Sequence, residues 1–149
     1  MECYEKQDLL KWRKLNQNVG NELVPRCFKW LRYYCPDEDD EEKTFYKVLN
    51  YANKVEICNI TGEEKYIAKL NEIADQVGEK CDYLFLQFDG EQGSEEVAKQ
   101  YVEVFRKFKN INTIRFEIIE DGNLTNILKL IMADVTFPWL TSVRIAKCY

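Results

Sequence analysis

Residues 81–90, CDYLFLQFDG, decide which fold class this sequence favours. Leu84, Leu86 and Phe88 alternate with Phe85 and Gln87, which is the period of a β-strand with one buried face. Similar phrases recur as ANKVEI at 52–57, INTIRFEI at 111–118 and LTSVRIAKC at 140–148. We therefore predict that 81–90 is one copy of a unit that is used four times.

The four phrases share a template with apolar or small residues at its first, fourth and sixth positions. Those positions hold Ala52, Val55, Ile57; Cys81, Leu84, Leu86; Ile111, Ile114, Phe116; Leu140, Val143, Ile145. Successive copies begin 29, 30 and 29 residues apart. Internal periods of about 20–50 residues are typical of solenoid repeats, in which each unit packs on its neighbours.

The three segments between these phrases have the apolar spacing of helices. Residues recurring at three- and four-residue intervals give each segment one apolar face. The faces comprise Tyr66, Ile67, Leu70, Ile73, Ala74, Val77; Val97, Ala98, Tyr101, Val102, Phe105, Phe108; and Leu124, Ile127, Leu128, Ile131. Gly78 is a candidate stop for the first helix.

This alternation predicts an α/β fold: a short right-handed solenoid with about four parallel strands and outer helices. The alternative is a doubly wound α/β sheet. Its strands are covered on both faces and are almost continuously apolar. The strands predicted here keep polar residues at alternate positions, which favours the solenoid.

Residues 52–149 resemble leucine-rich repeats of the long, ribonuclease-inhibitor-like type. LTSVRIAKC matches the L-x-x-L-x-L-x-x-N/C phrase of that family, with Val and Ile in place of Leu. The other copies depart at the ninth position, where Ile60, Asp89 and Ile119 stand. The resemblance implies a non-enzymatic interaction scaffold or adaptor whose strands line a concave binding face.

The first fifty residues are expected to form a helical N-terminal cap, since the first repeat of a solenoid needs one. We predict one helix over 7–23 and a second short helix from Pro25 that carries Phe28, Trp30, Leu31 and Tyr34. An acidic linker follows at 36–43. Residues 1–50 would thus be the cap and 51–149 the solenoid.

Residues 8–16, DLLKWRKLN, resemble the latter half of an F-box. That resemblance implies descent from an F-box and leucine-rich-repeat substrate receptor of a cullin ubiquitin ligase, with a Skp-type adaptor as partner. The half of the motif that contacts the adaptor is not found, because the sequence begins MECYE. The receptor is therefore the alternative to a scaffold.

Candidate partner-binding residues are those that point away from the core on the concave face. Three columns are predicted: Lys54, Tyr83, Thr113, Ser142; Glu56, Phe85, Arg115, Arg144; and Cys58, Gln87, Glu117, Ala146. Aromatic residues and arginine are enriched at binding hot spots. We predict that Tyr83, Phe85, Arg115, Glu117 and Arg144 bind an acidic or mixed segment of a protein. The alternative is that Arg115 pairs with Glu117 and that Phe85 is a scattered exposed hydrophobe.

The last strand is the second candidate surface. An uncovered parallel edge invites strand addition. We predict that Val143, Ile145 and Lys147 pair with a partner or with a second copy, giving a heterodimer or a homodimer. Trp139, just before this strand, could serve the core or the interface, and we expect it in the core.

Composition argues against several other functions. The 149 residues include no histidine, and the six cysteines show no C-x-x-C spacing. We expect free thiols, no enzymatic activity, and no catalytic, cofactor-binding or metal-binding residues. The net charge of −5 disfavours nucleic acid as a partner. Without an apolar run of about 20 residues or a signal segment, we expect an intracellular protein, cytoplasmic or nuclear, and no membrane partner.

Overall fold

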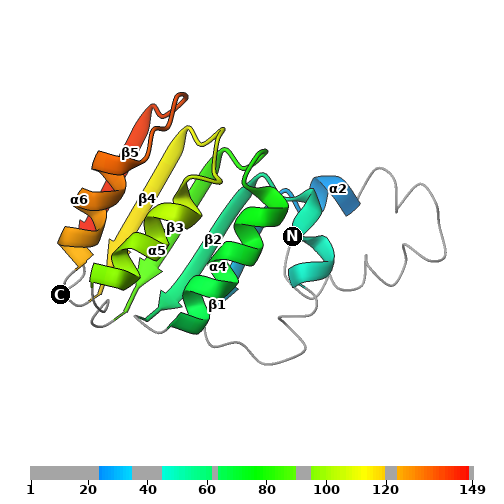
Figure 1. Cartoon of the computed structure of the whole chain (residues 1–149). Helices are drawn as coiled ribbons and strands as arrows, with labels where there is room; N and C mark the ends of the chain where they lie inside the picture. Colours follow the sequence, from blue (N-terminus) through cyan, green and yellow to red (C-terminus); the bar gives the residue numbers. More distant parts are fainter. Residues whose placement is uncertain (1–23, 35–44, 62–63, 90–94, 120–123, 148–149) are drawn as a thin grey trace.

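A computed structural model describes residues 24–34, 45–61, 64–89, 95–119 and 124–147 (Figure 1). Its strands are β1 (Trp30–Tyr34), β2 (Lys54–Ile60), β3 (Tyr83–Phe88), β4 (Thr113–Ile118) and β5 (Ser142–Lys147). Its helices are α2 (Val24–Cys27), the 3-10 helix η2 (Leu49–Tyr51), α4 (Glu64–Val77), α5 (Glu95–Phe105) and α6 (Leu124–Asp134). The fold is therefore α/β.

The strands form one parallel sheet in the order β1-β2-β3-β4-β5. Each strand is thus added beside the one before it, and the chain returns through a helix after β2, β3 and β4. Helices α4, α5 and α6 lie side by side over one face of the sheet (Figure 1). In the described part of the chain, the three crossover helices thus share one face, whereas a doubly wound sheet has crossover helices on both faces.

Strand β1 corrects the predicted N-terminal cap. We expected residues 25–34 to be a second short helix, but the helix ends at Cys27 and residues 30–34 pair with β2. Leu31 and Tyr33 are buried and alternate with exposed Trp30, Arg32 and Tyr34, so the period is two. The described part of 1–50 is therefore partly strand. The sheet includes residues on both sides of position 50, where we predicted the boundary between cap and solenoid. The predicted helix over 7–23 and most of the acidic linker lie outside the described residues.

A ladder of backbone hydrogen bonds precedes the strands and repeats with the sequence. The carbonyl oxygens of Lys29, Asn53, Asp82 and Asn112 each accept two amides, which belong to the two residues at and just before the start of the next strand. The Asn112 carbonyl, for example, accepts from Thr141 and Ser142 at 2.9 and 3.1 Å. Every turn into a strand after β1 thus satisfies its polar backbone groups in the same way.

The core lies between the sheet and the three helices. The template residues of β2, β3 and β4 are all buried, and so are the apolar faces predicted for α4 and α5. In α6, Leu128 and Ile131 are buried as predicted, while the side chains of Leu124 and Ile127 lie outside the described residues. The ring of Phe116 packs between those of Phe88 and Phe105, with centroids 6.4 and 6.2 Å away. Burying such side chains contributes about 1.5–3 kcal/mol each.

Gly78 ends helix α4 as predicted, and the structure shows why it must be small. A Cβ there would lie 2.4 Å from the Ala74 carbonyl oxygen and 2.5 Å from that of Lys107, in the turn after α5. The Gly78 carbonyl also accepts a hydrogen bond from the Lys109 amide at 3.1 Å. This glycine is therefore a point of close backbone contact between two successive repeats.

Candidate functional site on the open face of the sheet

The open face of the sheet, which we define as the face opposite α4, α5 and α6, carries rows of side chains in register. One row contains Trp30, Lys54, Tyr83, Thr113 and Ser142; the next contains Arg32, Glu56, Phe85, Arg115 and Arg144. The first two predicted columns are thus confirmed, and β1 adds a residue to each. In the third column, Gln87, Glu117 and Ala146 pair as expected.

Cys58 departs from that third column. It pairs with Tyr34 of β1, and the register between β2 and β3 shifts between Ile57 and Ile60. Asn59 has a φ of 58°, the left-handed conformation, which accommodates one extra residue in β2. The irregularity therefore lies at the end of the first of the four sequence copies.

Phe85 is not the exposed hydrophobe that one of the sequence interpretations assumed. The guanidinium carbon of Arg115 lies 5.1 Å from the centroid of its ring, and only 6% of Phe85 is exposed. A guanidinium over an aromatic face is a cation–π contact. The Phe85 ring therefore packs against the Arg115 guanidinium and has little accessible surface of its own.

Arg115 also pairs with Glu117 of the same strand, with Nη2 and Oε2 3.5 Å apart. The Glu117 carboxylate also accepts a hydrogen bond from the Gln87 side chain at 3.1 Å. The predicted pairing of Arg115 with Glu117 is thus confirmed. Because the Arg115 side chain remains 43% exposed, this ion pair leaves part of the guanidinium accessible.

Arg144 lies directly beside Arg115, its register partner on β4. It is exposed and forms no ion pair with any residue that the structure describes. Adjacent strands are about 4.8 Å apart, and like charges at opposed positions repel. The Arg115 and Arg144 pair is therefore an electropositive site that an anionic group would stabilise.

The β1 end of the open face is aromatic, and sequence reasoning missed it because β1 was expected to be helical. The Trp30 and Tyr83 rings meet with centroids 5.4 Å apart although Lys54 stands between them in the row. Trp30 and Tyr34 are about half exposed. A signal was present: Phe28, Leu31 and Tyr33 occupy the first, fourth and sixth template positions, and all three are buried.

Charges at this end are paired within the sheet. Arg32 Nε donates to Glu56 Oε2 at 2.8 Å, and Lys54 Nζ lies 3.0 Å from Asp82 Oδ1. The hydrogen bond to Glu56, and a second to the Tyr34 hydroxyl, raise the pKa of Arg32 above its ordinary value. Glu56 is buried, so its ion pair is structural. The β1 end therefore supplies aromatic surface, while the cationic site lies at β4 and β5.

The described cysteines are free, as predicted for the six thiols: Cys27 is half-buried, and Cys58 and Cys81 are buried. Cys3, Cys35 and Cys148 lie outside the described residues. Burial raises the pKa of Cys58 to about 11 and that of Cys81 to about 12. Both thiols are therefore protonated at neutral pH, where the thiol is a weak nucleophile.

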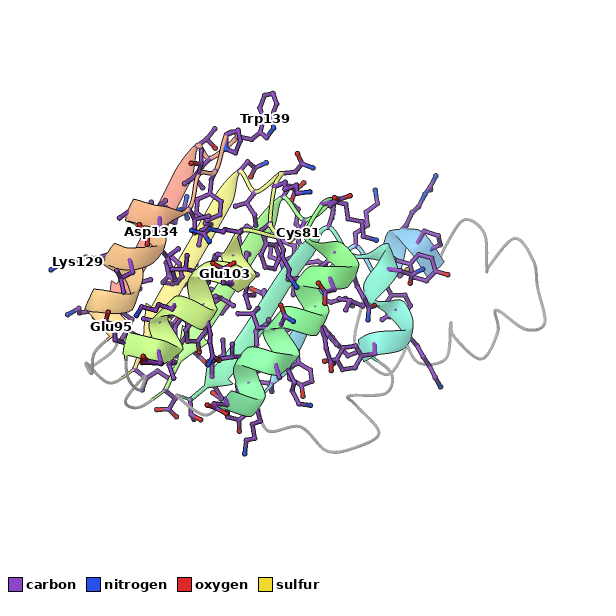
Figure 2. The ribbon with its side chains drawn as sticks, viewed as in Figure 1. Cys81, Glu95, Glu103, Lys129, Asp134 and Trp139 are labelled. Atoms are coloured by element: carbon purple, nitrogen blue, oxygen red, sulfur yellow. The ribbon has the colours of Figure 1, made fainter. Side chains whose placement is uncertain are left out.

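The last strand differs from the others on its helix side. Val143 and Ile145 occupy the fourth and sixth template positions, yet they are 39% and 56% exposed. Lys147 follows on the same face of β5 and is exposed. Trp139 is not in the core as we expected, because it is 65% exposed and projects beyond the end of the sheet where β5 begins (Figure 2).

The structure thus places Tyr83, Phe85, Arg115, Glu117 and Arg144 on one face, and Val143, Ile145 and Lys147 on the other face of the last strand. Within the described ranges, no helix combines the length and the apolar character that crossing a membrane requires. Comparisons of the chain with protein-family models, with curated proteins and with solved structures found no match.

Proposed function

We propose that this chain is a non-catalytic protein-binding module, built as a short right-handed solenoid of the leucine-rich-repeat kind. Support for the solenoid comes from the sequential parallel order of the strands, from the helices on one face and from the repeated ladder of turn hydrogen bonds. A parallel crossover of this kind is right-handed in about 98% of cases. Such a fold presents the open face of the sheet as a binding surface.

The partner is a protein segment that carries acidic residues, and it binds across β3, β4 and β5. The observation that carries this proposal is the pair formed by the partly exposed Arg115 and the exposed Arg144, held in register on adjacent strands, with Phe85 packed against Arg115. A carboxylate placed between the two guanidinium groups relieves their mutual repulsion and gains charge-assisted hydrogen bonds. Binding energy of this kind comes from contacts and needs no catalytic group.

The experiment is a tagged pull-down from native extract, followed by binding measurements on each purified partner. Charge reversal of both arginines, Arg115→Glu with Arg144→Glu, is expected to weaken binding at least tenfold. The matched control is Lys99→Glu with Lys109→Glu, which makes the same change in net charge at exposed sites away from the open face. The control should bind within about twofold of the unmodified chain. Partner binding that survives reversal of both arginines would contradict the proposal.

The same pull-down tests the alternative, a substrate receptor of a cullin ubiquitin ligase. Residues 8–16, which carry the F-box resemblance, lie outside the described residues. Recovery of a Skp-type adaptor together with a cullin would favour the receptor. Recovery of another stable partner without them would favour a scaffold.

A further inference from the structure

Strand β5, at one edge of the sheet, exposes side chains whose counterparts in the other repeats are buried. At the sixth template position, Ile57, Leu86 and Phe116 are at most 3% exposed, whereas Ile145 is 56% exposed. Val143 shows the same contrast with its partner Ile114, which is fully buried. Met132 of α6 and Trp139 are also exposed at this end. Within the described sheet, Val143 and Ile145 have a neighbouring strand on one side only, whereas the same positions of β2, β3 and β4 lie between two strands.

The backbone of β5 is also ready to pair. In the described sheet, β5 hydrogen-bonds to β4 alone, whereas β2, β3 and β4 each have two neighbours. Its register with β4 is unbroken from Ser142 to Lys147, so its outer edge is a regular strand edge. An added strand would gain main-chain hydrogen bonds along this edge, and alternate side chains would give specificity.

The charges on β5 determine which kind of added strand would bind beside it. Residues 135–147 contain Arg144 and Lys147 and no acidic residue. On the open face, a strand beside β5 places its side chains next to Arg144 and within reach of Arg115. On the helix side, its side chains meet Val143 and Ile145. A complementary strand therefore alternates acidic residues on one face with apolar residues on the other.

A second copy of this chain does not meet that requirement. Two-fold pairing of β5 with its copy keeps both open faces on the same side, because the axis is perpendicular to the sheet. The two Arg144 side chains, each with Arg115 behind it, would then gather on adjacent strands. Like charges placed across a strand pair are destabilising, so charge disfavours a homodimer through this edge.

We propose that an extended segment of a different protein, in which acidic and apolar residues alternate, adds to β5 as a sixth strand of the sheet. This deepens the protein-binding function proposed above but uses the edge of the sheet. The acidic residues of the segment lie on the open face near Arg144. Its apolar residues cover Val143 and Ile145.

The probe is a fluorescent peptide of the sequence Thr-Val-Glu-Val-Glu-Val-Thr, whose pattern reads the same in both directions. Its anisotropy is measured with the full chain, and we expect saturable binding. A peptide with Lys in place of both Glu residues should bind about tenfold more weakly, because its ammonium groups would then face the like charge of Arg144. N-methylation of the internal backbone amides on both edges of the peptide should abolish binding, because strand addition in either direction needs those donors.

Variants of the chain test where the peptide binds. Ile145→Asp should weaken binding at least tenfold, and it alters a side chain that is already largely in water. Arg144→Glu should reverse the preference, so that the Lys peptide binds about tenfold better than the Glu peptide. Lys99→Glu is the matched control for charge and should change binding less than twofold.

Several outcomes would overturn the proposal. One is the absence of binding at millimolar peptide; another is binding that N-methylation leaves unchanged. A concentration-dependent dimer in sedimentation that Ile145→Asp abolishes would show that a second copy occupies the edge. A pulled-down partner that tolerates Ile145→Asp but is lost with Arg115→Glu would retain the open-face function and refute the edge, so the two proposals fail separately.

Discussion

Truncating two residues at the same template position should cost very different amounts of stability. Leu86 is 0% exposed, between β2 and β4 and beneath the helices, whereas Ile145 on β5 is 56% exposed. Leu86→Ala removes buried methyl groups and leaves a closed cavity, which costs about 2–5 kcal/mol. Ile145→Ala leaves no closed cavity and loses under half of a full burial term of about 1.5–3 kcal/mol, so it should cost about 1 kcal/mol.

Urea unfolding, followed by tryptophan fluorescence and circular dichroism, measures the loss of unfolding free energy in each variant. Thermal unfolding measures the corresponding change in Tm. At about 2–4 °C per kcal/mol for a chain of this size, Leu86→Ala should lower Tm by about 10 °C and Ile145→Ala by about 3 °C. If Leu86→Ala does not fold, the milder pair Ile57→Val and Ile145→Val gives the same comparison on a smaller scale. Equal destabilisation at the two positions would mean that Ile145 is covered in solution. That result would contradict the uncovered edge at β5.

Two further predictions test other parts of the fold. Gly78→Ala should lower the free energy of unfolding by about 1–3 kcal/mol, because its Cβ would overlap the Lys107 carbonyl, and the exposed Gln76→Ala should change it by less than about 0.5 kcal/mol; a gain in stability on urea unfolding would contradict the close contact. Burial raises the pKa of Cys81 from 9.0 to about 12, so above pH 9 the unfolded chain loses the thiol proton that the folded chain keeps. Stability should therefore fall from pH 9 toward pH 12, by up to about 1.4 kcal/mol per pH unit from this thiol; denaturation series between pH 8 and 10 check this, and a Cys81→Ala chain with the same slope would refute it.

The repeat could be predicted because its signal is local and periodic. Strands β2 to β5 and the α4 and α5 faces each have a hydrophobic period that matches their structure. The constant spacing also predicts that Arg115 lies beside Arg144, and the sheet register confirms it. The same periodicity indicated which side of each strand faces the helices.

Strand β1 shows where that reasoning failed. Its spacing from β2 is 24 residues, shorter than the 29 or 30 residues between the other copies. Trp30, Leu31 and Tyr34 also fit a rough helical spacing. Pairing with β2, which is a tertiary interaction, decides in favour of the strand. Consequently the aromatic end of the open face, with Trp30 and Tyr34, was not predicted, although Phe28, Leu31 and Tyr33 match the template.

The sequence by itself determined the period of strands β2 to β5 and of the helices between them, the register of the first two open-face columns from β2 to β5, and the excess of basic residues on the last strand. Only the tertiary structure decided the fate of particular side chains within that frame. Phe85 and Ile145 are both apolar, yet the first is covered by the Arg115 guanidinium and the second is left in water. The physical reason is that a pattern of apolar residues fixes which face of a strand a side chain occupies, whereas its exposure depends on which neighbouring strands and side chains lie against it.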